Sequence, residues 1–317
     1  MRLELRQVTK HYGRRTALDT VDLTIASGAR VALLGPNGSG KTTLTRAILG
    51  LVRCDGEILV DGQPLGSRAE LAARLAYVPQ VTPQLGATVD EILGAVVSLR
   101  GLTRATVVEI AAELGLDLDR VRRQAVRGLS GGMRQKLFIA LALASPVELL
   151  VLDEPTASLD AAARARFLAR VAAIRDATVL LCSHRLDELH ALVDHVIALA
   201  DGHVAYDGPA AVYLDARQAA VIELRQRGDN AAWLTANGFS PGVGGWWSRA
   251  VSHAEKLALL PAALAALGGG LDDIVVRDTD RIDLEGTFPS PLSGAPVPGH
   301  SPPPRVASRE TLEVSRG

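Results

Sequence analysis

A glycine-rich run from Gly35 to Thr43 has the residue types and spacing needed to hold a chain of phosphates. It fits the pattern of a glycine, four residues and then Gly-Lys-Thr, with a further threonine behind it. Glycines let the backbone curl until successive amide N–H groups point inward, and the helix expected to follow adds partial positive charge. We predict that Lys41 reaches the terminal phosphates and that Thr42 offers its hydroxyl to Mg²⁺. The predicted loop consists of Gly35, Pro36, Asn37, Gly38, Ser39, Gly40, Lys41, Thr42 and Thr43.

An apolar strand that ends in two acidic residues is the second chemical feature. The run Leu149 to Leu152 would be buried along its length and would deliver Asp153 and Glu154 at its carboxyl end. Beside bound phosphates, Asp153 would support Mg²⁺, and Glu154 would act as general base or orient the attacking water. A strand ending in two solvated acids is the alternative, and the phosphate loop in the same chain argues against it.

A second helix start suited to anions follows Leu129. Ser130, Gly131 and Gly132 place a hydroxyl and two glycines before a helix expected from about Arg134. One nucleotide cannot easily satisfy two helix starts within one compact subunit. We therefore predict that two copies of the chain close each nucleotide from both sides.

With these motifs in order, the sequence from about Leu3 to Gly208 resembles the nucleotide-binding subunits of ATP-binding-cassette (ABC) transporters. The resemblance implies that the chain binds and hydrolyses ATP with Mg²⁺, dimerises around ATP, and serves a separate transmembrane permease. Met133 departs from the family, where glutamine is commonest, and we do not interpret this as loss of activity.

The resemblance also implies roles for single residues. Tyr12 would stack on adenine, although it could instead be a surface aromatic residue. Gln80 would contact Mg²⁺ and sense the membrane subunit. Asp160, in the run Ser158 to Asp160, would help to link the two nucleotide sites. His184 would hold the γ-phosphate and position Glu154, although a histidine at a strand end is often structural.

The segments around these motifs predict an α/β fold with a parallel sheet, a P-loop NTPase core and an ABC-type helical subdomain at about 87–127. We assign 1–219 to the ATPase domain and 220–286 to a small α+β domain with a helix at about 254–267, and expect short strands at 273–276 and 282–284. From 287 to 317 we predict a disordered tail, because seven of the 16 prolines lie there.

The small domain carries a weaker resemblance, between Glu255 and Ile274, to the C-terminal piece of bacterial exporters of the ABC-2 class. Met133 and the run Leu181 to His184 are similar to the copper-processing ATPases of nitrous oxide reductase maturation within that class. Because the chain has two Met and two Cys, any copper would be handled by a partner.

Composition narrows the remaining possibilities. A net charge of −1 supplies no basic field, so we expect no nucleic-acid partner. No signal peptide and no run of about 20 apolar residues is present, so we expect a cytoplasmic protein held at the inner face of the membrane by its permease. The alternatives are a cassette ATPase not linked to transport and a binding module without hydrolysis. The intact Lys41, Asp153, Glu154 and His184 argue against the latter.

Overall fold

The computed structural model describes residues 1–183, 186–215, 219–227 and 230–278. His184, the strand predicted at 282–284 and the tail predicted from 287 lie outside these ranges. Within the described residues, no helix combines the length and the apolar character needed to cross a membrane.

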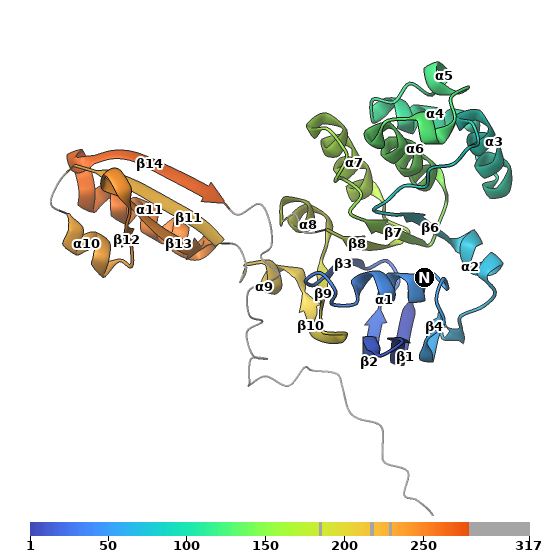
Figure 1. Cartoon of the computed structure of the whole chain (residues 1–317), viewed down its shortest axis with the longest axis horizontal. Helices are drawn as coiled ribbons and strands as arrows, with labels where there is room; N and C mark the ends of the chain where they lie inside the picture. Colours follow the sequence, from blue (N-terminus) through green and yellow to red (C-terminus); the bar gives the residue numbers. More distant parts are fainter. Residues whose placement is uncertain (184–185, 216–218, 228–229, 279–317) are drawn as a thin grey trace, which may run out of the picture. The chain divides into compact units, whose positions relative to one another are not determined.

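The predicted parallel sheet is present and carries the phosphate loop (Figure 1). The order of its strands is β10-β9-β3-β8-β7-β6. β10 is antiparallel to β9, whereas the other neighbouring pairs are parallel. Because β8 lies between β3 and β7, the residues that follow these three strands meet at one edge of the sheet. The bounds are β3 Arg30–Leu34, β6 Leu75–Val78, β7 Leu149–Asp153, β8 Thr178–Cys182, β9 His195–Ala200 and β10 His203–Pro209.

A second, antiparallel sheet has the order β2-β1-β4-β5. It consists of β1 Leu3–Tyr12, β2 Arg15–Ile25, β4 Asp55–Val60 and β5 Gln63–Pro64. Helix α1, Lys41–Ile48, joins the two sheets, because its Leu44 and Ile48 lie in one buried cluster with Leu3 of β1 and Leu33 of β3. The phosphate loop that precedes α1 is therefore anchored to the core of both sheets.

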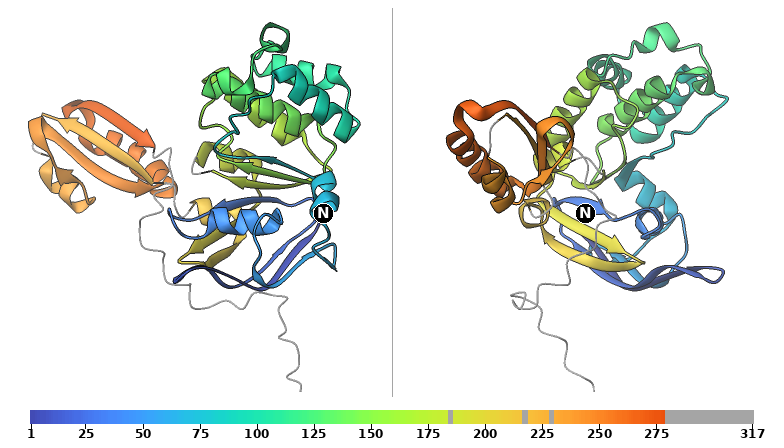
Figure 2. Two further views of the ribbon diagram at one scale, coloured as in Figure 1. Left: turned by 45° about the vertical axis from the view of Figure 1, so that its right-hand side comes forward. Right: turned by 60° about the vertical axis from the view of Figure 1, so that its left-hand side comes forward.

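Helices α3 and α4 lie within the range predicted for the helical subdomain, 87–127, and α6, which follows that range, packs against α4. These three helices gather apart from the antiparallel sheet (Figures 1 and 2). α3 begins with a capping box, in which the Thr88 hydroxyl accepts from the Glu91 amide and the Glu91 carboxylate accepts from the Thr88 amide. The helices of the first 215 residues beyond α1 are α2 Arg68–Arg74, α3 Val89–Arg100, α4 Arg104–Glu113, α5 Leu118–Val121, the 3-10 turn Val126–Gly128, α6 Gly131–Ala144, α7 Ala161–Ala173, α8 Leu186–Leu192 and α9 Ala210–Asp215.

A third sheet, of order β12-β13-β11-β14, forms the small α+β unit. The described residues of its buried cluster all lie from Ala220 onward and include Ile222 and Leu224 of β11 and Leu259 and Ala263 of α11. The sequence pattern alone does not predict where β11 lies in this sheet. That position depends on its pairing with β13 and β14, which come later in the chain. The elements are β11 Ala219–Gln226, α10 Ala231–Ala236, β12 Ser240–Pro241, the 3-10 turn Val243–Gly245, β13 Trp246–Ser252, α11 His253–Leu267, the 3-10 turn Gly268–Gly270 and β14 Leu271–Asp278.

Arg30, the first residue of β3, ties the strand before the phosphate loop to the ends of two helices. Its guanidinium donates to the carbonyls of Val171 (2.8 Å) and Ile174 (2.5 Å) at the end of α7. It also donates to Leu192 O at the end of α8, at 3.3 Å. A cation at helix C-termini satisfies carbonyls that have no partner within the helix and interacts favourably with the helix dipoles.

We predict that Arg30→Met lowers the free energy of unfolding by about 2 to 3 kcal/mol, because it removes charged hydrogen bonds from carbonyls that stay partly buried. Chemical denaturation followed by circular dichroism measures this change. The control is Arg227→Met, because Arg227 is 81% exposed and pairs with Asp272 at the surface, so its loss should cost less than about 1 kcal/mol. Equal losses for the two variants would contradict the assigned role of Arg30.

Candidate active site

The phosphate loop runs from the end of β3 to the start of α1, as the sequence predicts. Gly35 and Gly40 have φ of 144° and 108°, in the region that favours glycine. A Cβ atom on Gly35 would lie 2.3 Å from Leu199 O, and one on Gly40 would lie 2.5 Å from Ala17 O. Both positions therefore require glycine, because neighbouring backbone would have to move to admit a side chain.

Lys41 closes this loop on itself. Its Nζ atom donates to the carbonyls of Gly35 at 2.5 Å and Pro36 at 3.0 Å. Burial lowers the pKa of Lys41, and nearby acidic groups, among them Glu154 and Asp153, oppose that shift. A partly desolvated ammonium group beside a glycine-rich loop at a helix start is suited to bind polyphosphate.

Asp153 is the last residue of β7 and is half-buried. Burial raises the pKa of Asp153, and Lys41 and a hydrogen bond from Tyr77 oppose this rise. Burial also raises the pKa of Tyr77, to about 12, so this hydroxyl stays a donor at neutral pH. A desolvated carboxylate is stabilised by a divalent cation, and Mg²⁺ prefers oxygen ligands. Asp153, Gln80 and Thr42, which line one cavity, are the predicted set of such ligands.

Glu154 has a left-handed backbone, with φ of 46°. Its amide donates to Cys182 O of the neighbouring strand β8 at 2.8 Å. A non-glycine residue in this region costs free energy, and such strain often occurs at functional sites. Among the described non-glycine residues with positive φ, Glu154 alone lines the cavity. The sharp turn after β7 thus directs the second carboxylate away from the course of the strand.

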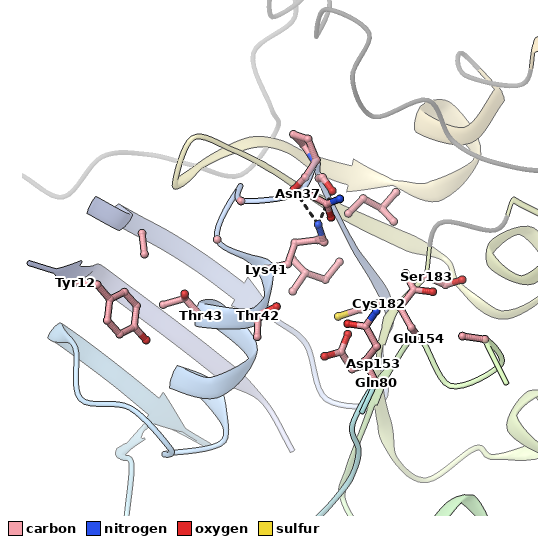
Figure 3. A pocket seen from close by; sticks show the side chains of 18 of the residues that line it. Tyr12, Asn37, Lys41, Thr42, Thr43, Gln80, Asp153, Glu154, Cys182 and Ser183 are labelled. Atoms are coloured by element: carbon pink, nitrogen blue, oxygen red, sulfur yellow. Dashed lines mark hydrogen bonds between the residues drawn. The ribbon is translucent and has the colours of Figure 1, made fainter. Parts of the chain in front are cut away.

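These residues line a cavity of 820 Å³ (Figure 3). Lys41 and Thr42 lie between Tyr12 on one side and Asp153, Gln80 and Glu154 on the other. Tyr12 is 46% exposed, which leaves its ring accessible. The predicted residues that line the cavity are Tyr12, Gly35, Pro36, Asn37, Gly38, Gly40, Lys41, Thr42, Thr43, Gln80, Asp153 and Glu154.

Ser39 differs from its neighbours in the loop. It is 2% exposed and is not among the residues that line the cavity. Within the described part of the chain its hydroxyl has no hydrogen-bond partner, and it would lie 2.5 Å from a Cβ atom on Gly35. A role for Ser39 in nucleotide binding stays a prediction.

The second anion-type helix start lies outside the cavity. Ser130 caps α6, and its hydroxyl accepts from the Met133 amide at 3.2 Å. Asp160 caps α7 and forms an ion pair with Lys136 of α6 at 2.8 Å. This hydrogen bond with Lys136 contributes most to lowering the pKa of Asp160 to about 2. Ser130, Gly131, Gly132 and Asp160 do not line the cavity that contains Lys41.

Several lining residues were not predicted, of which Arg15 is the most informative. Arg15 is the cross-strand partner of Tyr12 in the β1–β2 hairpin, and its guanidinium donates to Gly38 O at 3.1 Å. The sequence feature that could have indicated the pairing of Arg15 with Tyr12 was the tight turn at Gly13, whose φ is 59°, since a two-residue turn pairs the residues on either side of it.

Two further lining residues that were not predicted, Cys182 and Ser183, lie at the end of β8. Cys182 is buried, and burial raises the pKa of its thiol to about 12.

The comparison with known proteins agrees with this geometry. The sequence pattern of the family described as "ABC transporter" matches residues 18–157. The chain is 36% identical over 219 residues to the Nod factor export ATP-binding protein I of Cupriavidus metallidurans, an alignment that covers 65% of this chain and 70% of that protein. It is 38% identical to the corresponding protein of Rhizobium meliloti, of which it covers 66%. It is 37% identical to the zinc import ATP-binding protein ZnuC of a Ruegeria species, of which it covers 82%.

Solved structures show the same similarity. The structure of an ATP-binding subunit of an ABC transporter matches with a TM-score of 0.61 and 27% identity, over 67% of this chain and 91% of that one. A dimeric ATP-binding cassette in a post-hydrolysis state, bound to ADP and Pi, matches with a TM-score of 0.57 and 25% identity, over 65% and 98% of the two chains. The predicted fold class is confirmed. Similarity of this extent, which spans Lys41, Asp153 and Glu154 of the cavity, shows that the chain belongs to the ABC transporter family as one of its ATP-binding subunits.

Proposed function

We propose that the chain binds Mg-ATP in the 820 Å³ cavity and hydrolyses the terminal phosphate. The observation that carries this proposal is that Lys41, Asp153 and Glu154 line one cavity, although the acids are more than 100 positions from the loop. Lys41 would bind the terminal phosphates, and Glu154 would orient and deprotonate the attacking water. Tyr12 would take the adenine end.

Thr42, Gln80 and Asp153 would hold Mg²⁺, which when bound neutralises charge on the terminal phosphates. Burial of Asp153 supports this role, because a nearby divalent cation favours the charged carboxylate. We also propose that His184 holds the γ-phosphate, from its position in the sequence directly after Ser183.

Two copies of the chain would form two shared ATP sites. Ser130 and Gly131 are exposed at the start of α6 and do not line their own chain's cavity, which leaves this helix start available to a nucleotide held by a partner. A two-fold dimer would bring each phosphate loop to the Ser130–Gly132 motif of the other copy. The dimeric relative bound to ADP and Pi supports this arrangement.

We further propose that ATP-driven closure of this dimer drives a separate membrane permease of the exporter class. The Nod factor export relatives support this class, and the weak ABC-2 resemblance of the C-terminal unit agrees with it. Copper processing stays a narrower possibility within that class, with copper handled by the permease or another partner. We also propose 1–219, 220–286 and 287–317 as the ATPase domain, the α+β domain and the tail, supported by the separate core cluster from Ala220 onward.

We predict that Glu154→Gln binds ATP with nearly unchanged affinity and loses about 10²- to 10⁴-fold in turnover, because the amide keeps the shape but cannot accept a proton. Phosphate release measures turnover, and size-exclusion chromatography with Mg-ATP should detect a trapped dimer. Glu113→Gln is the control, since Glu113 pairs with Arg170 away from the cavity. Turnover near that of the unmodified protein in Glu154→Gln would refute the proposed role.

We predict that the position of two lesions on the dimer decides how much activity remains. Two differently tagged copies are purified in tandem. With Lys41→Ala and Ser130→Arg on the same copy, both shared sites are damaged, and ATP-dependent closure and turnover should be lost. With the lesions on opposite copies, both fall in one site, and the other site stays intact. Equal residual binding and turnover in the two arrangements would show that the sites are not shared.

We predict that the segment from Gln80 to Ile92 contacts the permease. Val81 is 79% exposed, whereas Leu85 is half-buried. Val81→Glu should therefore weaken copurification with the membrane protein and leave nucleotide affinity and stability unchanged, and Leu85→Glu should weaken assembly more. Leu51→Glu, at an exposed position elsewhere, is the control. Unchanged assembly of both segment variants would show that the permease contact lies elsewhere. Failure of the unmodified protein to copurify with any membrane protein would favour an ATPase that is not linked to transport.

A further inference from the structure

A buried polar cluster surrounds the turn that follows Glu154. Eight polar or charged residues are buried in the described part of the chain, and four of them, Gln135, Thr156, Ser183 and Glu188, belong to this cluster. Burying polar groups costs free energy unless they are hydrogen-bonded, so their concentration at one turn needs a physical reason.

Glu188 of α8 is the centre of the cluster. Its side chain is fully buried, and each carboxylate oxygen accepts a hydrogen bond from a different segment. The Thr156 hydroxyl donates to Oε1 at 2.6 Å, and the Ser183 hydroxyl donates to Oε2 at 3.0 Å. Thr156 lies two positions after Glu154, and Ser183 lines the cavity at the end of β8. One carboxylate therefore joins the segments that leave β7 and β8.

Gln135 makes a further contact with the same turn. Its Nε2 atom donates to Pro155 O at 3.1 Å. Gln135 belongs to α6, the helix that begins after Ser130. The Pro155–Thr156 turn is thus fixed both to the helix that starts with the Ser130 motif and to α8.

This double attachment lies next to the strained backbone of Glu154. The left-handed conformation there persists only if its surroundings hold it. The amide bond from Glu154 to Cys182 O fixes one side of the turn, and Glu188 fixes Thr156 on the other side. Figure 3 shows Glu154 and Ser183 at the same end of the cavity, beside Cys182.

We propose that Glu188 is a positioning residue, which fixes the turn after β7 so that the Glu154 carboxylate is aimed into the cavity. The proposal rests on the proposed function of Glu154 in orienting water. A role in stability alone explains the cluster less well, because well-packed apolar residues in place of a buried charged group often stabilise a protein equally well. A carboxylate offers two acceptors in fixed geometry, which suits the joining of two segments.

Glu188→Ala tests the proposal through the difference between binding and turnover. We expect kcat to fall about 10- to 100-fold, since small misplacements of reacting groups cost that much. The KM for ATP and the Kd of a fluorescent ATP analogue should stay within about twofold, because the phosphate loop is untouched. Glu188→Gln should recover much of kcat, because its oxygen can accept from Thr156 and its amide can donate to the Ser183 hydroxyl.

A matched pair of substitutions separates positioning from stability. Thr156→Val removes one hydroxyl from the cluster. Thr178→Val removes another buried hydroxyl, at the opposite end of β8, where Thr178 donates to Met1 O at 2.7 Å and accepts from the Gly28 amide at 3.0 Å. Both should lower the melting temperature, but only Thr156→Val should lower kcat. Equal effects of the two variants on kcat would overturn the proposal, and this pair also decides the matter if Glu188→Ala does not fold.

The double variant Glu154→Gln/Glu188→Ala shows whether Glu188 acts through Glu154. We expect it to turn over ATP no more slowly than Glu154→Gln alone, since the group to be positioned is already absent. Multiplied losses would mean that Glu188 acts through another group, which contradicts the proposal. If Glu154→Gln itself keeps its turnover, the proposed function fails. If Glu154→Gln is inactive but Glu188→Ala keeps its kcat, only this inference fails.

Discussion

The parallel pairing of β8 with both β3 and β7 is the constraint on which the site depends. Parallel strands in register end at one edge of a sheet, so the phosphate loop, Asp153 and Ser183 must emerge together. Arg30 stabilises this arrangement at the opposite end of β3 by binding the ends of α7 and α8. The packing of the helices on the sheet thus contributes to the geometry at the cavity, although Arg30 does not line it.

Two opposite charges, those of Lys41 and Asp153, are partly buried at that edge of the sheet. Lys41 and Asp153 are each desolvated, which disfavours both charges, and each favours the charge of the other. The neutral hydroxyl of Tyr77 adds a hydrogen bond to Asp153 without adding charge. Binding of phosphates to the ammonium group and of a divalent cation to the carboxylate would be favourable at such a site, because each ligand supplies the opposite charge to a group that has lost part of its hydration.

The turn after β7 links Glu154, which is proposed to orient the attacking water, to the helix that begins at the Ser130 motif, which is proposed to bind a partner's nucleotide. Glu154 faces its own chain's cavity, whereas Ser130 is exposed at the start of α6. Gln135, on that same helix, binds Pro155 next to Glu154. If a partner's nucleotide binds the Ser130 motif as proposed, it would act on a helix that is already attached to the turn after Glu154. This attachment gives a short physical route along which dimer closure could influence Glu154.

The sequence by itself determined the features that depend on neighbouring residues. The loop from Gly35 to Thr43 and the apolar strand that ends at Asp153 and Glu154 follow from glycine conformations and apolar runs that act over a few positions, and the structure has both, with β7 ending at Asp153. Only the tertiary structure placed Arg15 beside the loop, Tyr77 on Asp153, and Glu188 between Thr156 and Ser183. It also decided that β11 is an inner strand of the small sheet, between β13 and β14. These contacts join segments whose separation carries no periodic signal, and they form only when strand pairing and helix packing bring the segments together.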